Sequence, residues 1–343
     1  MESLSRPRTG SGAIAHVVTA LLALVLVPLS SVAFVLGMTG VFSLWNQVMQ
    51  RGVPLDQIEL GSREITGIVL TAVGIVLLVL VLLSGIASSA GLLVTGLYAL
   101  VDLACLSVPG FLLGAVQQVP GDFGLSLLQW TMYGFPALLH LTLLGAGIAL
   151  VIARRRPDPA AIVSLLGIVV APLLYLAGTW LLLLGAYEGL TYAAVTFNPT
   201  VPPAALLFVL AGTVVLLLGM TATRWSPWAG VLPALLLLAL TVVLVVPELS
   251  RMIPPGPGGI VFTLSSTLTV LGGGVALAVL LLAHTLVLAA VRHRSRRLLR
   301  SAGATDGRTR ADGSSTADGP DPDHWRSDVR YPEAPPQPGP VDR

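Results

Sequence analysis

Long runs of apolar residues recur along this chain, and short polar or turn-forming segments separate them. A membrane-spanning helix needs about 20 consecutive apolar residues to cross a hydrocarbon core of about 30 Å. By this measure the sequence predicts eight spans, at approximately residues 13–37, 65–84, 90–117, 129–153, 160–186, 204–221, 229–247 and 261–291. The pattern therefore predicts an all-α bundle of eight transmembrane helices over residues 13–292.

The breaks between adjacent runs rest on local signals. The stretch SGIASS at residues 84–89 is uncharged but small and turn-prone, and a single helix through it would be too long for one crossing. Arg224 and Pro227 separate the sixth run from the seventh. Residues 38–64 form a long connection with helical apolar spacing, which is typical of a lid, of a helix lying in the membrane interface or of an extension of the first span.

Arginine placement predicts the orientation. With residues 1–12 in the cytoplasm, eleven arginines fall on the inner side and three, Arg51, Arg63 and Arg251, fall on the outer side. This bias follows the positive-inside rule and agrees with an even number of spans and a cytoplasmic tail. Trp130 falls near the predicted outer interface, where aromatic side chains are enriched.

Composition narrows the class of protein. Charged residues make up 10% of the chain, against about a quarter in soluble domains, and hydrophobic residues make up 55%. All 19 basic residues are arginine, which with the abundance of Ala, Gly, Val and Pro suggests a GC-rich bacterial genome and hence the plasma (inner) membrane. One cysteine, Cys105, excludes an internal disulfide and a thiolate metal site within one chain. The dispersed arginines do not predict nucleic-acid binding.

The C-terminal segment, residues 293–343, changes character along its length. It begins within a cluster of arginines that we expect to anchor the last span to anionic lipid, namely Arg292, Arg294, Arg296, Arg297 and Arg300. From about Ser301 onward it is rich in Gly, Pro, Asp and Ser, so it cannot bury a core and is predicted to be disordered.

The two halves of the membrane region, residues 13–153 and 160–291, share a plan. LVPLS at residues 26–30 is similar to VAPLL at 170–174, and LVIARRR at 150–156 is similar to VLAAVRHR at 287–294. Four spans in each half would make a parallel repeat about an axis along the membrane normal. Asp102 would then face Thr241, and His140 would face Ala278, so any site built on Asp102 and His140 is unique to the first half.

Asp102 is the charged residue that lies deepest within a predicted span. An aspartate at the centre of a membrane helix costs about 2.5–3.5 kcal/mol, so it normally has a partner. His140 on the next span comes out at nearly the same depth, roughly 18–20 Å from the inner end at 1.5 Å per residue. We therefore predict a hydrogen bond or ion pair between Asp102 and His140, with Pro136 one turn before the histidine as a possible kink.

Three further side chains accompany this pair at helical spacing. Thr95 and Tyr98 lie on the stripe of Asp102, and Tyr133 lies on that of His140. The pair could relay protons or bind a cation, or it could only tie two helices together. Gly272, Gly273 and Gly274 could break the last span and expose backbone to a ligand, or could allow close helix packing.

No nucleotide, zinc-protease or serine-hydrolase motif occurs, and the outer carboxylates are scattered, so no catalytic, metal or cofactor site is predicted. Two functions remain from different classes. The first is a non-enzymatic scaffold or accessory subunit of a membrane complex, with other membrane proteins as partners. The second is a small-solute or proton-coupled transporter that uses the Asp102–His140 pair.

Overall fold

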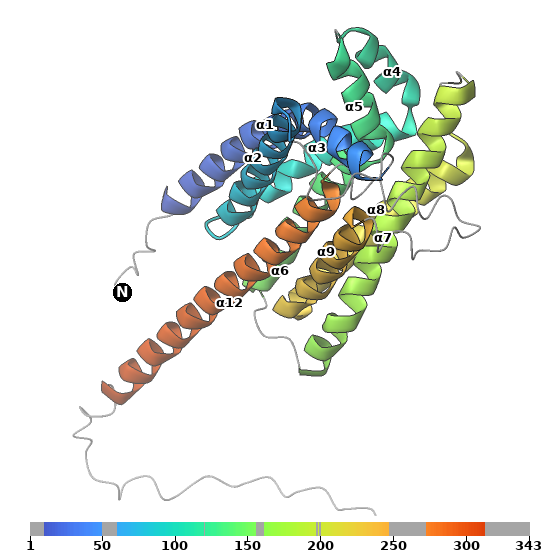
Figure 1. The fold of residues 1–343 in the computed structure, drawn as a ribbon. Coiled ribbons are helices and arrows are strands. Elements are labelled where there is room, and N and C mark those ends of the chain that lie inside the picture. The colour runs from blue at the N-terminus through green and yellow to red at the C-terminus, as the bar shows by residue number, and fades with distance from the viewer. Residues whose placement is uncertain are drawn as a thin grey trace, which may run out of the picture. The chain divides into compact units, whose positions relative to one another are not determined.

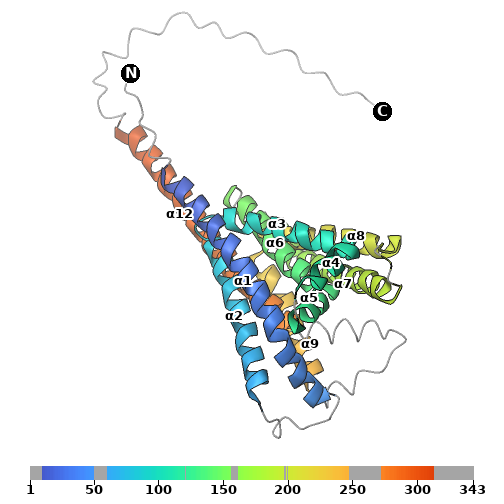
Figure 2. The ribbon, with the colours of Figure 1, turned by 90° about the horizontal axis from the view of Figure 1, so that it is seen from above.

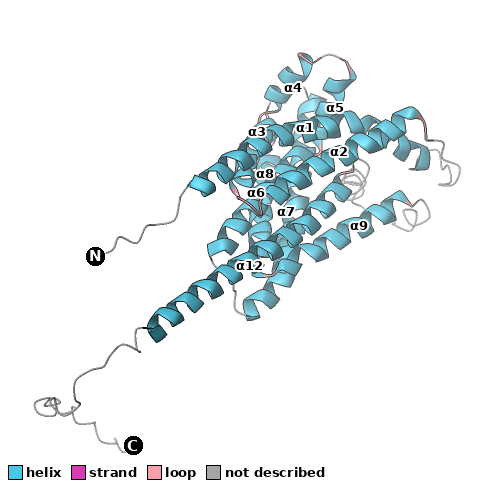
Figure 3. Cartoon of the chain, turned by 90° about the vertical axis from the view of Figure 1, so that its left-hand side faces the viewer, coloured by secondary structure: helices cyan, strands magenta, loops and turns pink. Residues whose placement is uncertain are grey.

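The protein is an all-α bundle in this computed structural model, which describes residues 10–49, 60–119, 121–155, 161–196, 198, 200–246 and 272–312. Within these ranges Figure 3 shows helices and loops without strands. The chain divides into two units, residues 1–296 and 297–343, and the packing described below is that of the first. Seven of the described helices are long and apolar enough to cross a membrane. The chain is thus a multi-pass membrane protein.

Helices α1 and α7 are much longer than the spans predicted for them. Helix α1, Gly10–Met49, continues without interruption through most of the connection predicted after the first span, so this part extends that span, while residues 50–59 lie outside the described part. Helix α7, Ala161–Thr196, runs ten residues past the predicted end at residue 186. At 1.5 Å per residue these helices are about 60 Å and about 54 Å long, so each must project beyond the hydrocarbon layer or cross it obliquely.

The third and fourth predicted spans are each broken into two helices, which corrects the sequence prediction. Helix α3, Ala90–Ser107, is followed by α4, Pro109–Gln117; helix α5, Asp122–Met132, precedes α6, Phe135–Arg155. Figure 1 shows α4 and α5 as a helical hairpin at one end of the bundle. Along the sequence this hairpin connects α3 to α6, and α3 and α6 still pack directly against each other.

Backbone chemistry explains both breaks. Val108 has φ −130° and ψ 79°, because the ring of the following Pro109 disfavours the helical region for the preceding residue. Gly134 has φ +68°, a left-handed conformation that favours glycine, and it separates α5 from α6. Pro136 consequently lies in the first turn of α6, where its missing N–H has no helical partner to lose. The predicted kink at Pro136 is therefore wrong.

The remaining helices follow the predicted order. Helix α2 covers Ser62–Ser84 and α8 covers Pro203–Ala222, followed by the short turns η2, Thr223–Trp225, and η3, Pro227–Gly230. Helix α9, Val231–Val245, has 15 residues and is the counterpart of the seventh predicted span. Its length of about 22 Å is shorter than a typical hydrocarbon core, so the prediction of eight full spans is not confirmed.

Helix α12, Gly273–Asp312, corresponds to the eighth predicted span. Gly272 has φ +70° directly before it, and residues 251–271 lie outside the described part. A Cβ atom on Gly273 would lie 2.3 Å from the Phe135 ring, so the glycine run serves close packing here. The helix continues past Ser301 to Asp312, while disorder of residues 313–343, outside the described part, stays a prediction.

Glycines let two helix pairs pack backbone against backbone. α1 and α2 lie side by side in Figure 1 and Figure 2, and a Cβ atom on Gly67 of α2 would lie 2.7 Å from Cα of Gly40 on α1. In the pair of α7 and α8, a Cβ atom on Gly212 would lie 2.4 Å from the backbone N of Leu182. Side chains at these positions would push the helices apart, as is usual at small-residue contacts in membranes.

α6 and α12 are the most buried helices of the bundle. α6 packs on α3, where Gly147 meets Leu92, and on α8, where Gly145 meets Met220. The start of α12 meets Thr71 of α2 through Gly272, and its middle belongs to the same apolar core as α6. By contrast, α1, α2, α7 and α8 leave many large apolar side chains exposed, as contact with lipid requires.

An arginine closes the same end of each half of the bundle. The Arg154 guanidinium at the end of α6 donates to the backbone carbonyl of Gly85, just after α2. The Arg292 guanidinium on α12 donates to the carbonyl of Arg224, just after α8. We call the end of the bundle that holds these four residues the arginine end. The paired contacts are those that a parallel repeat would produce, and the repeat itself stays a prediction.

Candidate functional site

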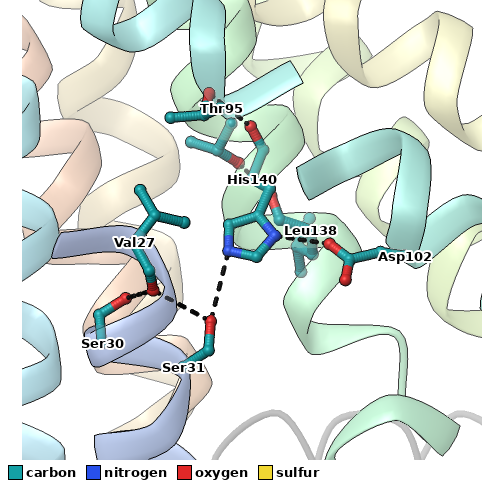
Figure 4. A network of polar contacts seen from close by, with 8 residues as sticks. Val27, Ser30, Ser31, Thr95, Asp102, Leu138 and His140 are labelled. Carbon is teal, nitrogen blue, oxygen red and sulfur yellow. Dashed lines mark hydrogen bonds and ion pairs between the residues drawn. The ribbon is translucent and has the colours of Figure 1, made fainter. Parts of the chain in front are cut away.

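Asp102 and His140 meet inside the bundle, from α3 and α6 respectively. Nδ1 of His140 lies 2.5 Å from Oδ2 of Asp102 (Figure 4). Asp102 lies about 18 Å along α3 from its first residue, and His140 about 22 Å from the arginine end of α6, at 1.5 Å per residue. The structure thus brings together the two residues that the sequence singled out, at similar depths on neighbouring helices.

Thr95 links α3 to α6 and lies two turns before Asp102 on α3. Its hydroxyl lies 2.6 Å from the carbonyl oxygen of Leu92 and 3.4 Å from that of His140. It is fully buried. Thr95 therefore holds the backbone of His140 rather than its ring, and it helps to set the distance between α3 and α6.

The second ring nitrogen of His140 faces α1. Nε2 lies 3.5 Å from the hydroxyl oxygen of Ser31, and that hydroxyl donates to the carbonyl of Val27 at 3.2 Å (Figure 4). Because the Ser31 proton is directed to Val27, the serine oxygen is placed to accept from an Nε2–H of His140. Asp102, His140 and Ser31 then form a polar chain across three helices.

One proton lies between Nδ1 of His140 and Oδ2 of Asp102 in either of two arrangements. With the proton on nitrogen the pair is an imidazolium and a carboxylate, and with the proton on oxygen it is a neutral imidazole and a carboxylic acid. A histidine that also donates from Nε2 fits both arrangements. The pair can therefore hold and transfer a proton without a change in heavy-atom positions.

Tyr98 joins α3 to α1 through a carbonyl that a proline leaves free. Pro28 has no N–H, so the carbonyl of Leu24, four residues before it, receives no helical hydrogen bond. The Tyr98 hydroxyl donates to this oxygen at 2.8 Å. The Tyr98 ring also lies 5.7 Å from the His140 ring, at an angle of 48°. We call Ser31, Tyr98, Asp102 and His140 the membrane polar cluster.

The two partners of the central pair differ in exposure. The His140 side chain is 5% exposed, whereas that of Asp102 is 16% exposed. Oδ1 of Asp102 accepts no hydrogen bond from the described residues, while Oδ2 faces the histidine. Cys105, one turn further along α3, is half-buried. The carboxylate thus lies at the boundary between the core and the surface of the bundle.

Tyr133 does not join this cluster. It ends α5 before α6 begins, and its ring stacks on Tyr187 of α7 with centroids 6.3 Å apart. Trp130 is buried between Phe34 and Phe135, with ring centroids 5.2 Å and 5.0 Å away, so its predicted place in a lipid-facing aromatic belt is wrong. These rings link α1, α5, α6 and α7 instead of lining the polar cluster.

Sequence reasoning missed Ser31 and the contact between Tyr98 and Leu24. Helical spacing places residues along one helix, but it does not identify the helix that lies beside it. A usable signal was present, because Pro28 within a long apolar run implies a free carbonyl at Leu24 that needs a donor. The sequence pattern around Pro136 predicted a kink instead.

A second buried histidine lies on α12. Nε2 of His284 is 2.8 Å from the hydroxyl oxygen of Thr223, which lies 2.6 Å from the carbonyl of Met220. Nearby on α12, Arg292 is buried against Arg224, in contrast to the predicted role of Arg292 as a lipid anchor. Arg294, Arg296 and Arg297 are exposed, and the side chain of Arg300 is outside the described part.

The chemistry of the described residues is sparse beyond these contacts. Among them no group of three His, Cys, Asp or Glu side chains is placed to hold a metal ion. No known protein family, curated protein or solved structure matches this chain.

Proposed function

We propose that this multi-pass membrane protein is a non-enzymatic scaffold or accessory subunit of a larger membrane complex. The observation that carries the proposal is that several buried threonine hydroxyl groups in the bundle turn back onto their own helices. Thr142 lies 2.7 Å from the carbonyl of Leu138, and Thr213 and Thr285 make the same bond four residues back, at 2.8 Å and 3.0 Å.

This pattern argues against a path for polar solutes through the described bundle. A hydroxyl that donates to its own helix has no proton to offer to a substrate, although its oxygen can still accept. The core around α6 and α12 is continuous and apolar, built largely from Leu, Ala and Val side chains. A transporter needs polar groups that converge on a binding site near the middle of the membrane.

The proposal includes an orientation and a lipid environment. We place the arginine end in the cytoplasm, with both termini on that side of a bacterial inner membrane, because the arginine bias follows the positive-inside rule. Arg294, Arg296, Arg297 and Arg300 then lie where anionic headgroups are found, and we propose that they bind these lipids.

The test of a subunit role is the mass and composition of the protein as it leaves its own membrane. After mild extraction of the tagged full chain, native mass spectrometry should show it bound to a second membrane protein in a fixed ratio. The same ratio should survive when the chain is expressed from its own promoter. A chain that leaves the membrane alone, at its monomer mass, would contradict the proposal.

Proton-coupled transport is the second candidate, favoured by the polar chain from Asp102 through His140 to Ser31. The 2.5 Å contact between Asp102 and His140 suits a group that passes a proton. Full-length protein in liposomes should then carry a proton flux that Asp102→Asn abolishes, while Cys105→Ser leaves it unchanged. A flux equal to that of empty liposomes would leave the subunit role as the one supported.

A further inference from the structure

We infer that the surface of α1 and α3 around Asp102 docks a transmembrane helix of another protein, and that this helix carries a cationic side chain at mid-membrane. This inference rests on the proposed subunit role and names the chemistry of the partner. Its basis is the unequal use of the two oxygens of the Asp102 carboxylate.

The position of the Asp102 carboxylate supports this inference. A charged side chain is costly in hydrocarbon, and Asp102 lies about 18 Å into a helix whose whole length is about 27 Å. His140 satisfies Oδ2, but Oδ1 has no donor among the described residues and the side chain is 16% exposed. Lipid tails offer no hydrogen bond, so a protein donor at this surface would remove the remaining cost.

The surface near Asp102 exposes large apolar side chains. Leu97 and Val101 on α3 are 58% and 56% exposed, and Leu24 on the neighbouring α1 is also exposed. Tyr98 bridges these two helices through Leu24, so the exposed leucines and the carboxylate belong to adjacent helices in direct contact. An apolar helix with one polar residue would fit such a surface, since apolar side chains would replace lipid and the polar one would reach Asp102.

The described spans of this chain do not themselves provide such a cation at their surface. In the described spans the arginines lie at helix ends, as Arg63, Arg154 and Arg292 do. His284 is deep in α12 but is 1% exposed, and His16 is near the start of α1. No described span therefore offers a surface cation at the depth of Asp102, which favours a different protein as the partner.

The position that the predicted repeat aligns with Asp102 in the second half has no carboxylate. There Thr241 of α9 donates to the carbonyl of Leu237 at 2.8 Å, so its hydroxyl group already has an acceptor within its own helix. A cationic helix would gain nothing from Thr241. The docking surface is accordingly predicted in the first half, on α1 and α3, and Thr241 supplies a matched control.

The test uses a synthetic helix of known composition. The full chain, labelled with a fluorophore at a tagged terminus, is placed in liposomes with a labelled Leu-rich transmembrane peptide that carries one central arginine or leucine. Energy transfer should show about tenfold tighter binding of the arginine peptide, in the range of polar contacts between model membrane helices. Asp102→Asn should remove this preference, and Thr241→Ala should keep it.

A second variant tests the inference in case Asp102→Asn does not fold. Val101→Trp leaves the carboxylate in place but adds bulk to the exposed face, so it should weaken binding of the arginine peptide while the protein stays folded. Equal binding of the two peptides to the natural chain, or an arginine preference that survives Asp102→Asn, would overturn the inference.

A cross-linking experiment separates failure of this inference from failure of the subunit role. A photoreactive residue at Leu97 in the native membrane should capture one membrane protein, whose captured helix carries Arg or Lys near its centre. Capture of a helix without such a residue would overturn the cationic inference and leave the subunit role standing. A chain that captures nothing at Leu97 and leaves the membrane as a monomer would overturn both.

Discussion

The two halves of the bundle share several packing contacts, and they differ in the polar side chains that they hold within the membrane. α1 with α2 and α7 with α8 are both joined at glycines, and Arg154 and Arg292 both close the arginine end onto a backbone carbonyl. Among the described residues, the first half alone places a carboxylate beside a histidine, Asp102 beside His140. The shared contacts concern stability, and the contact that differs is the one on which we base the docking surface and the second candidate function.

Breaking the glycine contacts should have the largest effect on either half. Gly67→Leu and Gly212→Leu each force a side chain into a neighbouring backbone, and overpacking of this kind costs about 1–3 kcal/mol or more. We expect each variant to lower the yield of monodisperse protein in size-exclusion chromatography at least about tenfold. Gly114→Leu is the control, because a Cβ atom there meets nothing within 4 Å.

The next effect separates the two buried histidines, and it is measured as thermal stability rather than as folded yield. Removing one partner of a buried ion pair costs about 3–5 kcal/mol, whereas a neutral hydrogen bond contributes about 1 kcal/mol. His140→Ala should therefore lower the thermal unfolding temperature in detergent more than His284→Ala does. Adding Asp102→Asn to His140→Ala should restore part of the loss, and equal losses for the two histidines would show that Asp102 is not charged beside His140.

The arginine contacts should have similar effects in both halves. A hydrogen bond from a charged donor contributes about 1.5–3 kcal/mol, so Arg154→Gln and Arg292→Gln should each destabilise the protein by an amount in this range. Thermal unfolding in nanodiscs would measure both, with the exposed Arg155→Gln as the control. A loss at one arginine and none at the other would argue against the repeat.

The smallest predicted effect concerns the hydrogen bond from Tyr98 to the Leu24 carbonyl that Pro28 leaves free. Interhelical hydrogen bonds in membranes contribute about 0.6 kcal/mol on average, so Tyr98→Phe should destabilise by about that amount. In a Pro28→Ala background the helix supplies its own N–H to Leu24, and Tyr98→Phe should then have no effect. A double-mutant cycle on unfolding temperatures checks this, and additive losses would show that the two residues act independently.

The pairing of Asp102 with His140 was predictable because rise per residue translates sequence position into depth on two adjacent antiparallel helices. The break at Val108 and Pro109 was also open to prediction, since proline disfavours a helical conformation in the residue before it. The contact of His140 with Ser31 was not, because it depends on which helix lies beside α6. The burial of Trp130 likewise arises from α5 folding back as a separate helix, which hydropathy does not reveal.

The hydrogen bond from Tyr98 to the free carbonyl of Leu24 also affects how α1 can move. A helix with a proline bends most easily where its hydrogen bond is missing, and here a neighbouring helix supplies that bond from the side. Any bending of α1 at Pro28 would therefore also change the contact between α1 and α3. A partner that pushed α3 sideways at Asp102 would loosen α1 at Leu24 and so alter the angle of the whole N-terminal helix.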